Sequence, residues 1–182
     1  QKLFITSEED FESKVHLTAS AFSKRINKDL TSPRLIMIVP TLRCDHHCSY
    51  CQVSRVNADL SGFDLQPSQI PSLINYIKKI EKPPYKIEFQ GGEPLLAFDF
   101  IQTFYEQFEI EVGKGNFNIV IATSLSLVDE SIINWCRGKN VGFSTSIDAG
   151  KKAHNKHRKL ITKNSFELVQ KNINWIHHEL GR

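Results

Sequence analysis

Three of the four cysteines in this chain lie close together, in the segment PTLRCDHHCSYCQVSR of residues 40–55. Cys44, Cys48 and Cys51 have the spacing C-x3-C-x2-C. Three thiolates in a short segment are typical ligands of a 4Fe-4S cluster, in which each thiolate holds one iron. A cluster held in this way keeps one iron free, so the pattern predicts a site at which that iron binds a substrate or a cofactor.

Zinc is the main alternative for this segment, because His46 or His47 could supply a fourth ligand. Structural zinc sites more often have C-x2-C pairs separated by a longer spacer, and the sequence has no second pair. A disulfide is disfavoured by the odd number of cysteines and by the reducing compartment that we expect. We expect both histidines to face solvent. Cys136 lies in a helical pattern, and we expect it in the core because free cysteines are usually buried.

The elements that position these thiols follow a regular order after residue 34. Short β-prone segments alternate with amphipathic helical segments, and this order predicts an α/β fold of parallel βα repeats, either open or curled into part of a barrel. In such sheets functional groups gather at the carboxyl ends of the strands, where the cysteine segment begins. The predicted strands are 35–39, 86–90, 117–123 and 141–147, and the predicted helices are 68–80, 99–110, 129–137 and 165–179.

Composition excludes several other classes of protein. The chain has 182 residues, 40% hydrophobic and 24% charged, which is typical of a globular domain. The longest apolar run, residues 35–39, is too short to cross a membrane. The start of the chain does not resemble a signal peptide, so we expect a soluble, cytoplasmic protein. The net charge of +3 is too small to indicate a nucleic-acid partner.

Two further segments are less informative. Residues 1–32 predict a helical extension, in which Ser7 and Asp10 have the spacing of a capping box. Residues 33–182 then form the main domain. The positive charge is concentrated in residues 150–163, which fit a solvated loop and an anion-binding segment equally well.

The cysteine segment resembles the signature of the radical S-adenosylmethionine (radical SAM) superfamily, because Tyr50 precedes the last cysteine. The resemblance implies that S-adenosylmethionine chelates the free iron. It also implies an external electron donor, whose electron cleaves the cofactor and yields a deoxyadenosyl radical that abstracts hydrogen from a substrate carbon.

A second motif, QGGEPLL, directly follows the second predicted strand. Gly91 and Gly92 permit backbone conformations and close approaches that other residues resist, and Glu93 offers a carboxylate to a cation. A plain strand-to-helix turn is the alternative. The motif resembles the family's GGE motif, which implies that these residues hold the amino group of the cofactor's methionyl part.

A third motif, STSIDAGKKAHNKHR, follows the fourth predicted strand and resembles a segment of radical SAM enzymes that modify peptides and proteins, such as the anaerobic sulfatase maturases. Ser146, Asp148, His154 and Arg158 stand at the matching positions. The resemblance implies that Ser146 and Asp148 contribute to the cofactor site and that Arg158 pairs with the cofactor's carboxylate, a task suited to a guanidinium.

The sequence departs from these enzymes at several positions. Ala149 and Asn155 replace the Gly and Asp of the third motif. At the end of the third predicted strand, Thr123 matches the family's T-N-G pattern, whereas Ser124 and Leu125 replace Asn and Gly. We expect Ser124 to line the site.

The resemblance also implies a fold and a substrate class. The family's core is a partial, TIM-like (β/α)6 barrel, of which this sequence predicts about four units. We therefore expect an amino-terminal fragment, inactive alone, that lacks the C-terminal half of the barrel and any auxiliary-cluster domain. The substrate would be a peptide or protein, and the cysteine segment most resembles maturases of the His-Xaa-Ser system. The alternative is a non-catalytic binding module stabilised by zinc or by an iron–sulfur cluster.

Overall fold

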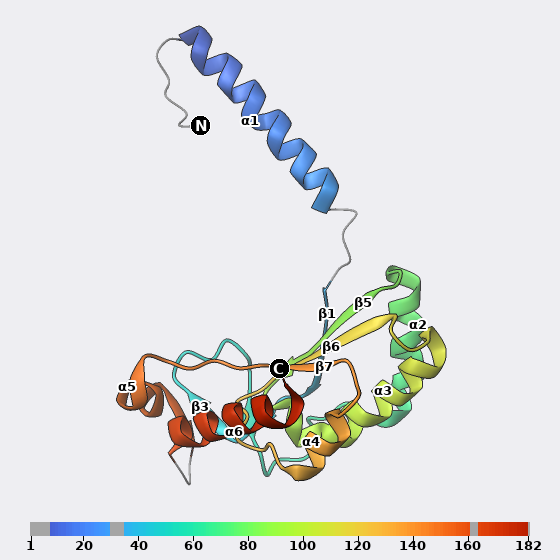
Figure 1. The fold of residues 1–182 in the computed structure, drawn as a ribbon, viewed down its shortest axis with the longest axis vertical. Helices are drawn as coiled ribbons and strands as arrows, with labels where there is room; N and C mark the ends of the chain where they lie inside the picture. The colour runs from blue at the N-terminus through green and yellow to red at the C-terminus, as the bar shows by residue number, and fades with distance from the viewer. Residues whose placement is uncertain (1–7, 30–34, 161–163, 182) are drawn as a thin grey trace. The chain divides into compact units, whose positions relative to one another are not determined.

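The computed structural model describes residues 8–29, 35–160 and 164–181. The chain divides into two compact units, residues 1–33 and 34–182. The first unit contains one helix, α1 (Glu8–Asp29), drawn in blue in Figure 1. The helix exposes Phe11, Val15, Leu17 and Phe22. Ser7 of the expected capping box lies outside the described residues.

The second unit is built on a four-stranded sheet with the order β1-β5-β6-β7. Neighbouring strands pair in parallel throughout, with Ile87 opposite Ile119 and Ile119 opposite Val141. This arrangement confirms the α/β fold of parallel βα repeats (Figure 1). The strands are β1 (Leu35–Thr41), β5 (Tyr85–Gly91), β6 (Phe117–Ala122) and β7 (Val141–Ser144).

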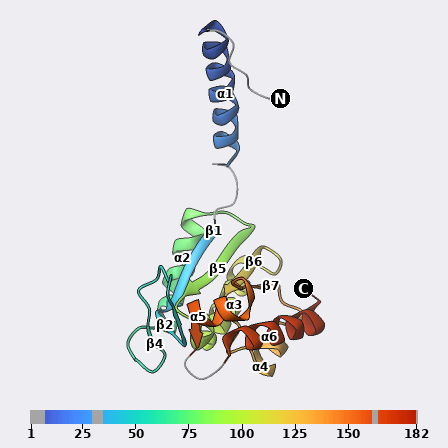
Figure 2. The same cartoon turned by 90° about the vertical axis from the view of Figure 1, so that its left-hand side faces the viewer.

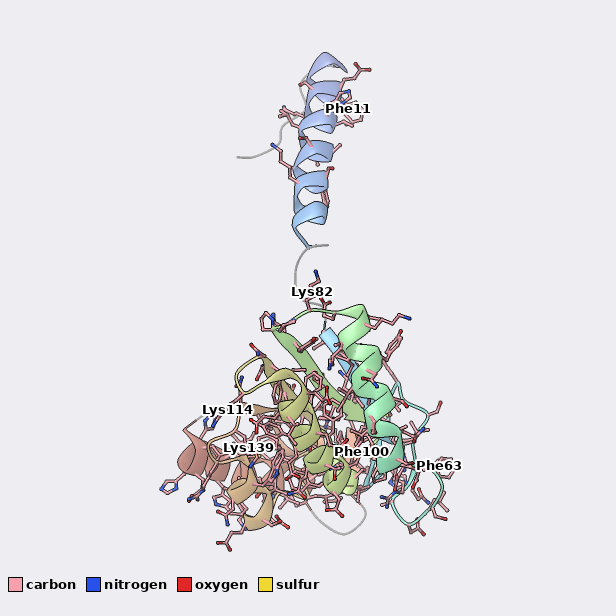
Figure 3. The ribbon with its side chains drawn as sticks, turned by 90° about the vertical axis from the view of Figure 1, so that its right-hand side faces the viewer. Phe11, Phe63, Lys82, Phe100, Lys114 and Lys139 are labelled. Carbon is pink, nitrogen blue, oxygen red and sulfur yellow. The ribbon has the colours of Figure 1, made fainter. Side chains whose placement is uncertain are left out.

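Helices pack against this sheet through an apolar core of isoleucines and aromatic side chains. Phe104 stacks on Phe108 and meets the edge of Phe89, with ring centroids 5.2 and 5.5 Å apart. The side chain of Phe100 lies in the same layer (Figure 3). The helical elements are η1 (Pro67–Gln69), α2 (Ile70–Ile80), η2 (Pro94–Ala97), α3 (Phe98–Val112), α4 (Glu130–Cys136) and α6 (Ser165–Leu180).

The cysteine segment contains short strands rather than a plain loop. β2 (Arg43–Cys44) pairs with β4 (Val56–Asn57), and β3 (His46–Cys48) pairs antiparallel with β8 (Arg158–Leu160). These pairings tie the thiols to segments that lie far apart in the sequence.

The solvated loop that the sequence allowed for residues 150–163 is wrong where the structure describes it. Residues 150–160 form helix α5 (Gly150–His157) and strand β8. The helix forms because the buried side chain of His154 gives this charged segment an inward face, which packs against α6. β3, α5 and α6 lie together in Figure 1, and Figure 2 shows α5 beside α6 from another side.

The edge of the sheet at β7 lies beside an apolar groove. Strand β7 forms one edge of the sheet, and a groove of about 520 Å³ runs between it and α6, lined by apolar residues such as Phe143 and Ile176. None of the helices in the described part of the chain has the length and apolar character needed to cross a membrane.

Candidate functional site

A cavity of about 360 Å³ lies where the carboxyl ends of the four parallel strands meet. All three cysteines of the C-x3-C-x2-C segment line it. So do most of the other side chains and glycines that the sequence predicts for the site, namely Tyr50, Gly91, Gly92, Glu93, Ser124, Ser146 and Arg158. Asp148 does not line the cavity but contacts Tyr50, which does.

The three thiols are free and differ in burial. Cys44 and Cys48 are half-buried and Cys51 is exposed. Burial raises the pKa of Cys44 to about 12. Burial also raises the pKa of Cys48, although the nearby charge of Arg158 acts in the opposite direction. Among the described residues, no three Cys, His, Asp or Glu side chains converge as a ready-made metal site. Because the pKa values of Cys44 and Cys48 are raised, metal binding would have to displace protons from these two thiols.

The glycines of the second motif allow two backbone segments to approach each other closely. A Cβ atom on Gly92 would lie 2.1 Å from the carbonyl oxygen of Arg43, and one on Gly91 would lie 2.4 Å from that of Thr41. The backbone N–H of Gly92 donates to Thr41, and that of Glu93 donates to Arg43 at 2.7 Å. In this structure the neighbour that requires glycine is thus the segment leading into Cys44.

Tyr50, Asp148 and Arg158 form a polar cluster beside the cavity. The Tyr50 hydroxyl donates to Asp148 Oδ1 at 2.7 Å, and Arg158 Nη1 donates to that hydroxyl at 3.2 Å. The guanidinium also lies over the Tyr50 ring, 5.9 Å from its centroid. Asp148 Oδ2 is buried, and it has no partner among the described residues. The cluster therefore presents an unused acceptor close to the thiols.

Glu93 lines the cavity but is almost fully buried and surrounded by hydrogen-bond partners. Thr123 Oγ1 donates to Oε1 at 2.6 Å and the backbone N–H of Leu95 donates to it at 3.2 Å. The backbone N–H of Ser124 donates to Oε2 at 2.8 Å, and Ser124 Oγ lies 2.7 Å from the same oxygen. Burial raises the pKa of Glu93 above the usual carboxyl range, against the opposing effect of these contacts.

Two serines connect Glu93 to Asp45, the residue after Cys44. Ser124 Oγ lies 2.8 Å from Ser126 Oγ, which lies 2.5 Å from Asp45 Oδ2. These contacts join the second motif to the cysteine segment. Burial acts to raise the pKa of both carboxyls. The pKa of Glu93 is raised, whereas hydrogen bonds from His46 and Ser126 bring the pKa of Asp45 below its usual value.

His46 is not the solvent-facing residue that the sequence suggested. Its side chain is 2% exposed, with Nδ1 2.8 Å from Asp45 Oδ1 and Nε2 2.8 Å from Ser165 Oγ. Pairing of β3 with β8 turns this imidazole inward against the start of α6, where both ring nitrogens have partners. His47 is half-buried, and its Nδ1 has no partner among the described residues. The burial of Cys136 is confirmed.

Sequence reasoning missed several polar residues of the site. Asp45 and Ser126 join the motifs below the cavity, Ser165 contacts His46, and Thr145 lines the cavity with a buried hydroxyl that lacks a partner in the described part of the chain. Ser126 had a detectable signal, since it alternates with buried or half-buried leucines directly after a predicted strand. Ser165 had none, because it begins a helix far away in the sequence.

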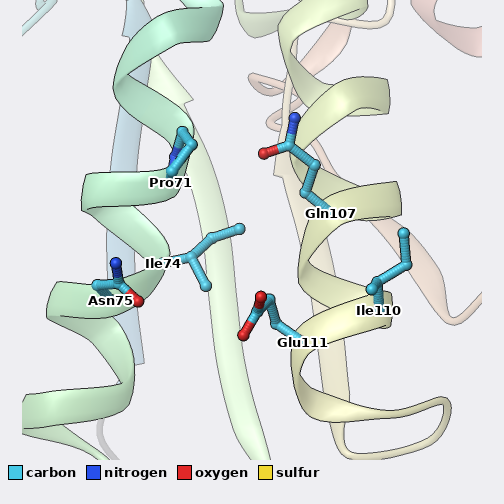
Figure 4. Close-up of a pocket in the computed structure, with 6 residues that line it drawn as sticks. All are labelled: Pro71, Ile74, Asn75, Gln107, Ile110 and Glu111. Carbon is cyan, nitrogen blue, oxygen red and sulfur yellow. The ribbon is translucent and has the colours of Figure 1, made fainter.

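A second pocket, of about 210 Å³, lies between α2 and α3 (Figure 4). Its polar side chains are Asn75, Gln107 and Glu111, and the carboxylate of Glu111 accepts a hydrogen bond from Lys78 at 2.6 Å. Without a nucleophile or a convergent set of ligands, this pocket is a weaker candidate than the cavity beside the thiols.

Comparison with known proteins identifies the family of the chain. The family model of the radical SAM superfamily matches residues 38–180. The radical SAM cyclopropyl synthase TigE of Paramaledivibacter caminithermalis is 25% identical over 173 residues, which cover 84% of this chain and 36% of that protein. An uncharacterised protein of Methanocaldococcus jannaschii is 28% identical over 113 residues, which cover 62% of this chain and 38% of that protein.

Solved structures show the same fold. Native anSMEcpe with bound AdoMet has a TM-score of 0.67 at 19% identity, covering 80% of this chain and 40% of that one. Streptococcus suis SuiB has a TM-score of 0.59 at 14% identity, covering 100% of this chain and 39% of that one. The chain thus spans about two fifths of the length of the proteins that it matches. Because the family model matches residues 38–180, which include the cysteine segment and most of the sheet, the chain belongs to the radical SAM superfamily.

Proposed function

We propose that this chain is the cluster-binding part of a radical SAM enzyme that modifies a peptide or protein. The observation that carries the proposal is the convergence of three motifs on one cavity. The thiols of Cys44, Cys48 and Cys51 lie there beside Gly92 and Glu93 of the second motif and Ser146 and Arg158 of the third. The three motifs follow three different strands of the sheet, β1, β5 and β7.

The donor set fits a 4Fe-4S cluster with S-adenosylmethionine. Three free thiols match the three cysteine ligands that leave one iron open. The unpartnered oxygen of Asp148 and the hydroxyl of Thr145 are acceptors of the kind that a polar cofactor uses. When bound, a reduced cluster would supply one electron, taken from an external donor, and S-adenosylmethionine would be cleaved to methionine and the deoxyadenosyl radical.

The chain's own residues then bind and orient the cofactor. A guanidinium has five N–H donors, and the contact of Arg158 with Tyr50 uses one of them, so Arg158 is our candidate for the cofactor's carboxylate. Gly91, Gly92 and Glu93 are our candidates for its amino group. Tyr50, held between Arg158 and Asp148, would fix the mouth of the cavity. Ser124 and Ser146 would complete the lining.

A peptide substrate is favoured by the related proteins. One structure of anSMEcpe contains both AdoMet and the Kp18Cys peptide, and its TM-score to this chain is 0.68. TigE is named as a cyclopropyl synthase.

We propose that further strands of a longer protein continue the barrel along the edge of β7, beside the apolar groove, and that turnover needs them.

Anaerobic reconstitution with iron and sulfide tests the proposal. The wild-type chain should take up both and gain the broad visible absorption of a 4Fe-4S cluster. Cys44→Ala, Cys48→Ala and Cys51→Ala should each abolish this absorption while the far-ultraviolet circular dichroism stays unchanged. Cys136→Ala is the matched control, because it removes a thiol from the core and should leave iron uptake intact.

The alternative is a non-catalytic module stabilised by zinc, and the same experiment separates the two. Stoichiometric zinc binding with no uptake of iron would contradict our proposal. A Cys48→Ala chain that fails to fold would also favour the structural module, because a domain held by its apolar core should stay folded without the metal.

A further inference from the structure

We propose that Ser126 and Ser165 are positioning residues that hold the cysteine segment in place through a directed chain of hydrogen bonds ending on Asp45. This series of hydrogen bonds has two arms, and each arm ends on a different oxygen of Asp45. The inference rests on the proposed function only where it identifies the cavity as the cofactor site, since the hydrogen bonds are present in the chain without a cluster.

The first arm runs from α5 through α6 to the cysteine segment. The backbone N–H of Asp148 donates to His154 Nδ1 at 3.3 Å, so the ring proton of a neutral His154 must be on Nε2. That nitrogen lies 3.0 Å from Ser165 Oγ and therefore donates to it. The hydroxyl of Ser165 is left to donate to His46 Nε2 at 2.8 Å.

The tautomer of His46 follows from this order. Because Nε2 accepts from Ser165, the ring proton of His46 is on Nδ1, which donates to Asp45 Oδ1 at 2.8 Å. Each group in the arm thus donates once toward Asp45. His46, Ser165 and His154 are all buried, so their polar atoms have little access to water and depend on these partners.

The second arm reaches the other oxygen of Asp45 from β6. Ser126 Oγ donates to Asp45 Oδ2 and is itself in contact with Ser124, which is in contact with the buried carboxyl of Glu93. The two arms together join the second motif, the end of β6, the cysteine segment and the start of α6. Asp45 follows Cys44 directly, so its side chain fixes the backbone that carries that thiol.

The group of Asp45, His46 and Ser165 is not a nucleophilic triad, although the order of residue types is the same. Ser165 is 2% exposed, so no substrate reaches its hydroxyl. The hydroxyl oxygen also accepts a hydrogen bond from His154, which occupies a lone pair that a nucleophile would use for attack. The arrangement can hold atoms in place but cannot attack a substrate.

Nuclear magnetic resonance of the iron-free chain with isotope-labelled histidine tests the direction of the first arm. His46 should be the Nδ1–H tautomer and His154 the Nε2–H tautomer. Ser165→Ala should change the resonance of His46 Nε2, and Ser165→Thr, which keeps the hydroxyl, should restore it. A His46 found as the Nε2–H tautomer in the wild-type chain would overturn the proposal.

The reaction rate of the Cys44 thiol with iodoacetamide, followed by mass spectrometry of its peptide, tests the positioning itself. Loss of one buried hydrogen bond should raise the rate by roughly fivefold to tenfold in Ser126→Ala and Ser165→Ala. Ser131→Ala is the matched control, because it removes an exposed serine hydroxyl on α4, and it should leave the rate unchanged.

The outcomes are separable from those of cluster binding. Unchanged rates in folded Ser126→Ala and Ser165→Ala chains would refute positioning, whether or not the chain binds iron. If Ser165→Ala does not fold, Ser126→Ala on the other arm decides the question. If the wild-type chain fails to take up iron, while its histidines are the expected tautomers and both alanine variants show raised rates, the proposed function is refuted and the positioning role stands.

Discussion

Two regions of this domain are built by different physical rules. Between the sheet and helices α2 and α3, the side chains are apolar and the contacts depend on shape, as in the stack of Phe104 on Phe108. At the carboxyl ends of the strands, buried polar groups such as Glu93 and His46 depend on the direction of hydrogen bonds. The first region provides the free energy of folding, and the second fixes where the thiols lie.

The apolar region should show the largest loss of stability on truncation. Phe104 is 0% exposed and contacts two aromatic neighbours, so Phe104→Ala should reduce the free energy of unfolding by about 3–5 kcal/mol. Ile110→Ala on the same helix is the control, since Ile110 is 83% exposed and should change little. Urea denaturation measures both. Equal losses in the two variants would mean that this layer is not the core.

The junction between the regions should give the next largest effect. Gly92→Ala would place a methyl group against the backbone carbonyl of Arg43, and backbone cannot rotate away as a side chain can. We expect a loss of about 1–3 kcal/mol, typical of forced overpacking, and a displaced Cys44 segment. Gly142→Ala is the control, because nothing lies near the added methyl group. A Gly92→Ala chain as stable as wild type would show that the two strand ends do not meet as described.

The polar region should respond to a change that leaves shape intact. In Glu93→Gln the amide can replace the protonated carboxyl toward Ser124 Oγ but cannot accept from the backbone N–H of Ser124. This backbone N–H would lose its acceptor, so the free energy of unfolding of Glu93→Gln at low pH should be lower than that of wild type by about 1–3 kcal/mol.

The difference between Glu93→Gln and wild type should then depend on pH. Because the pKa of Glu93 is raised in the folded chain, its contribution to stability is complete below the ordinary carboxyl pKa and is lost as the pH rises through the raised value. The glutamine variant lacks this loss, so the difference in free energy of unfolding between wild type and Glu93→Gln should become smaller as the pH rises. Denaturation measured across pH would contradict this account if the gap widened instead.

The apolar region was also the more predictable one from sequence. Short β-prone runs located all four parallel strands, and the usual burial of a free cysteine in a helical segment predicted that of Cys136, because each depends on local sequence. His46 was misplaced because its burial depends on β8 and Ser165, which lie more than a hundred residues away. Proximity of a polar group to a distant partner has no local periodicity, so the hydrogen-bonded chain could not be predicted.

The smallest expected effect concerns a carboxyl on the outer side of the apolar region. Asp129 caps α4 and accepts a hydrogen bond from the backbone N–H of Ile132 at 2.9 Å. Asp129→Ala should therefore lower the free energy of unfolding by about 1 kcal/mol.

The pH dependence of this variant follows from the pKa of Asp129, which hydrogen bonds from Ser131 and Ile132 lower. The contribution of Asp129 to stability is therefore present above the ordinary carboxyl pKa and is lost as the pH falls through the lowered value. The pH dependence of this variant should therefore have the opposite sign to that of Glu93→Gln, with the gap to wild type closing in acid. Asp129→Asn keeps the capping oxygen and should recover most of the loss at neutral pH. If the stability differences of the Glu93 and Asp129 variants changed with pH in the same direction, burial would not be what distinguishes the two carboxyls. That result would contradict the comparison between the water-exposed cap and the enclosed polar region.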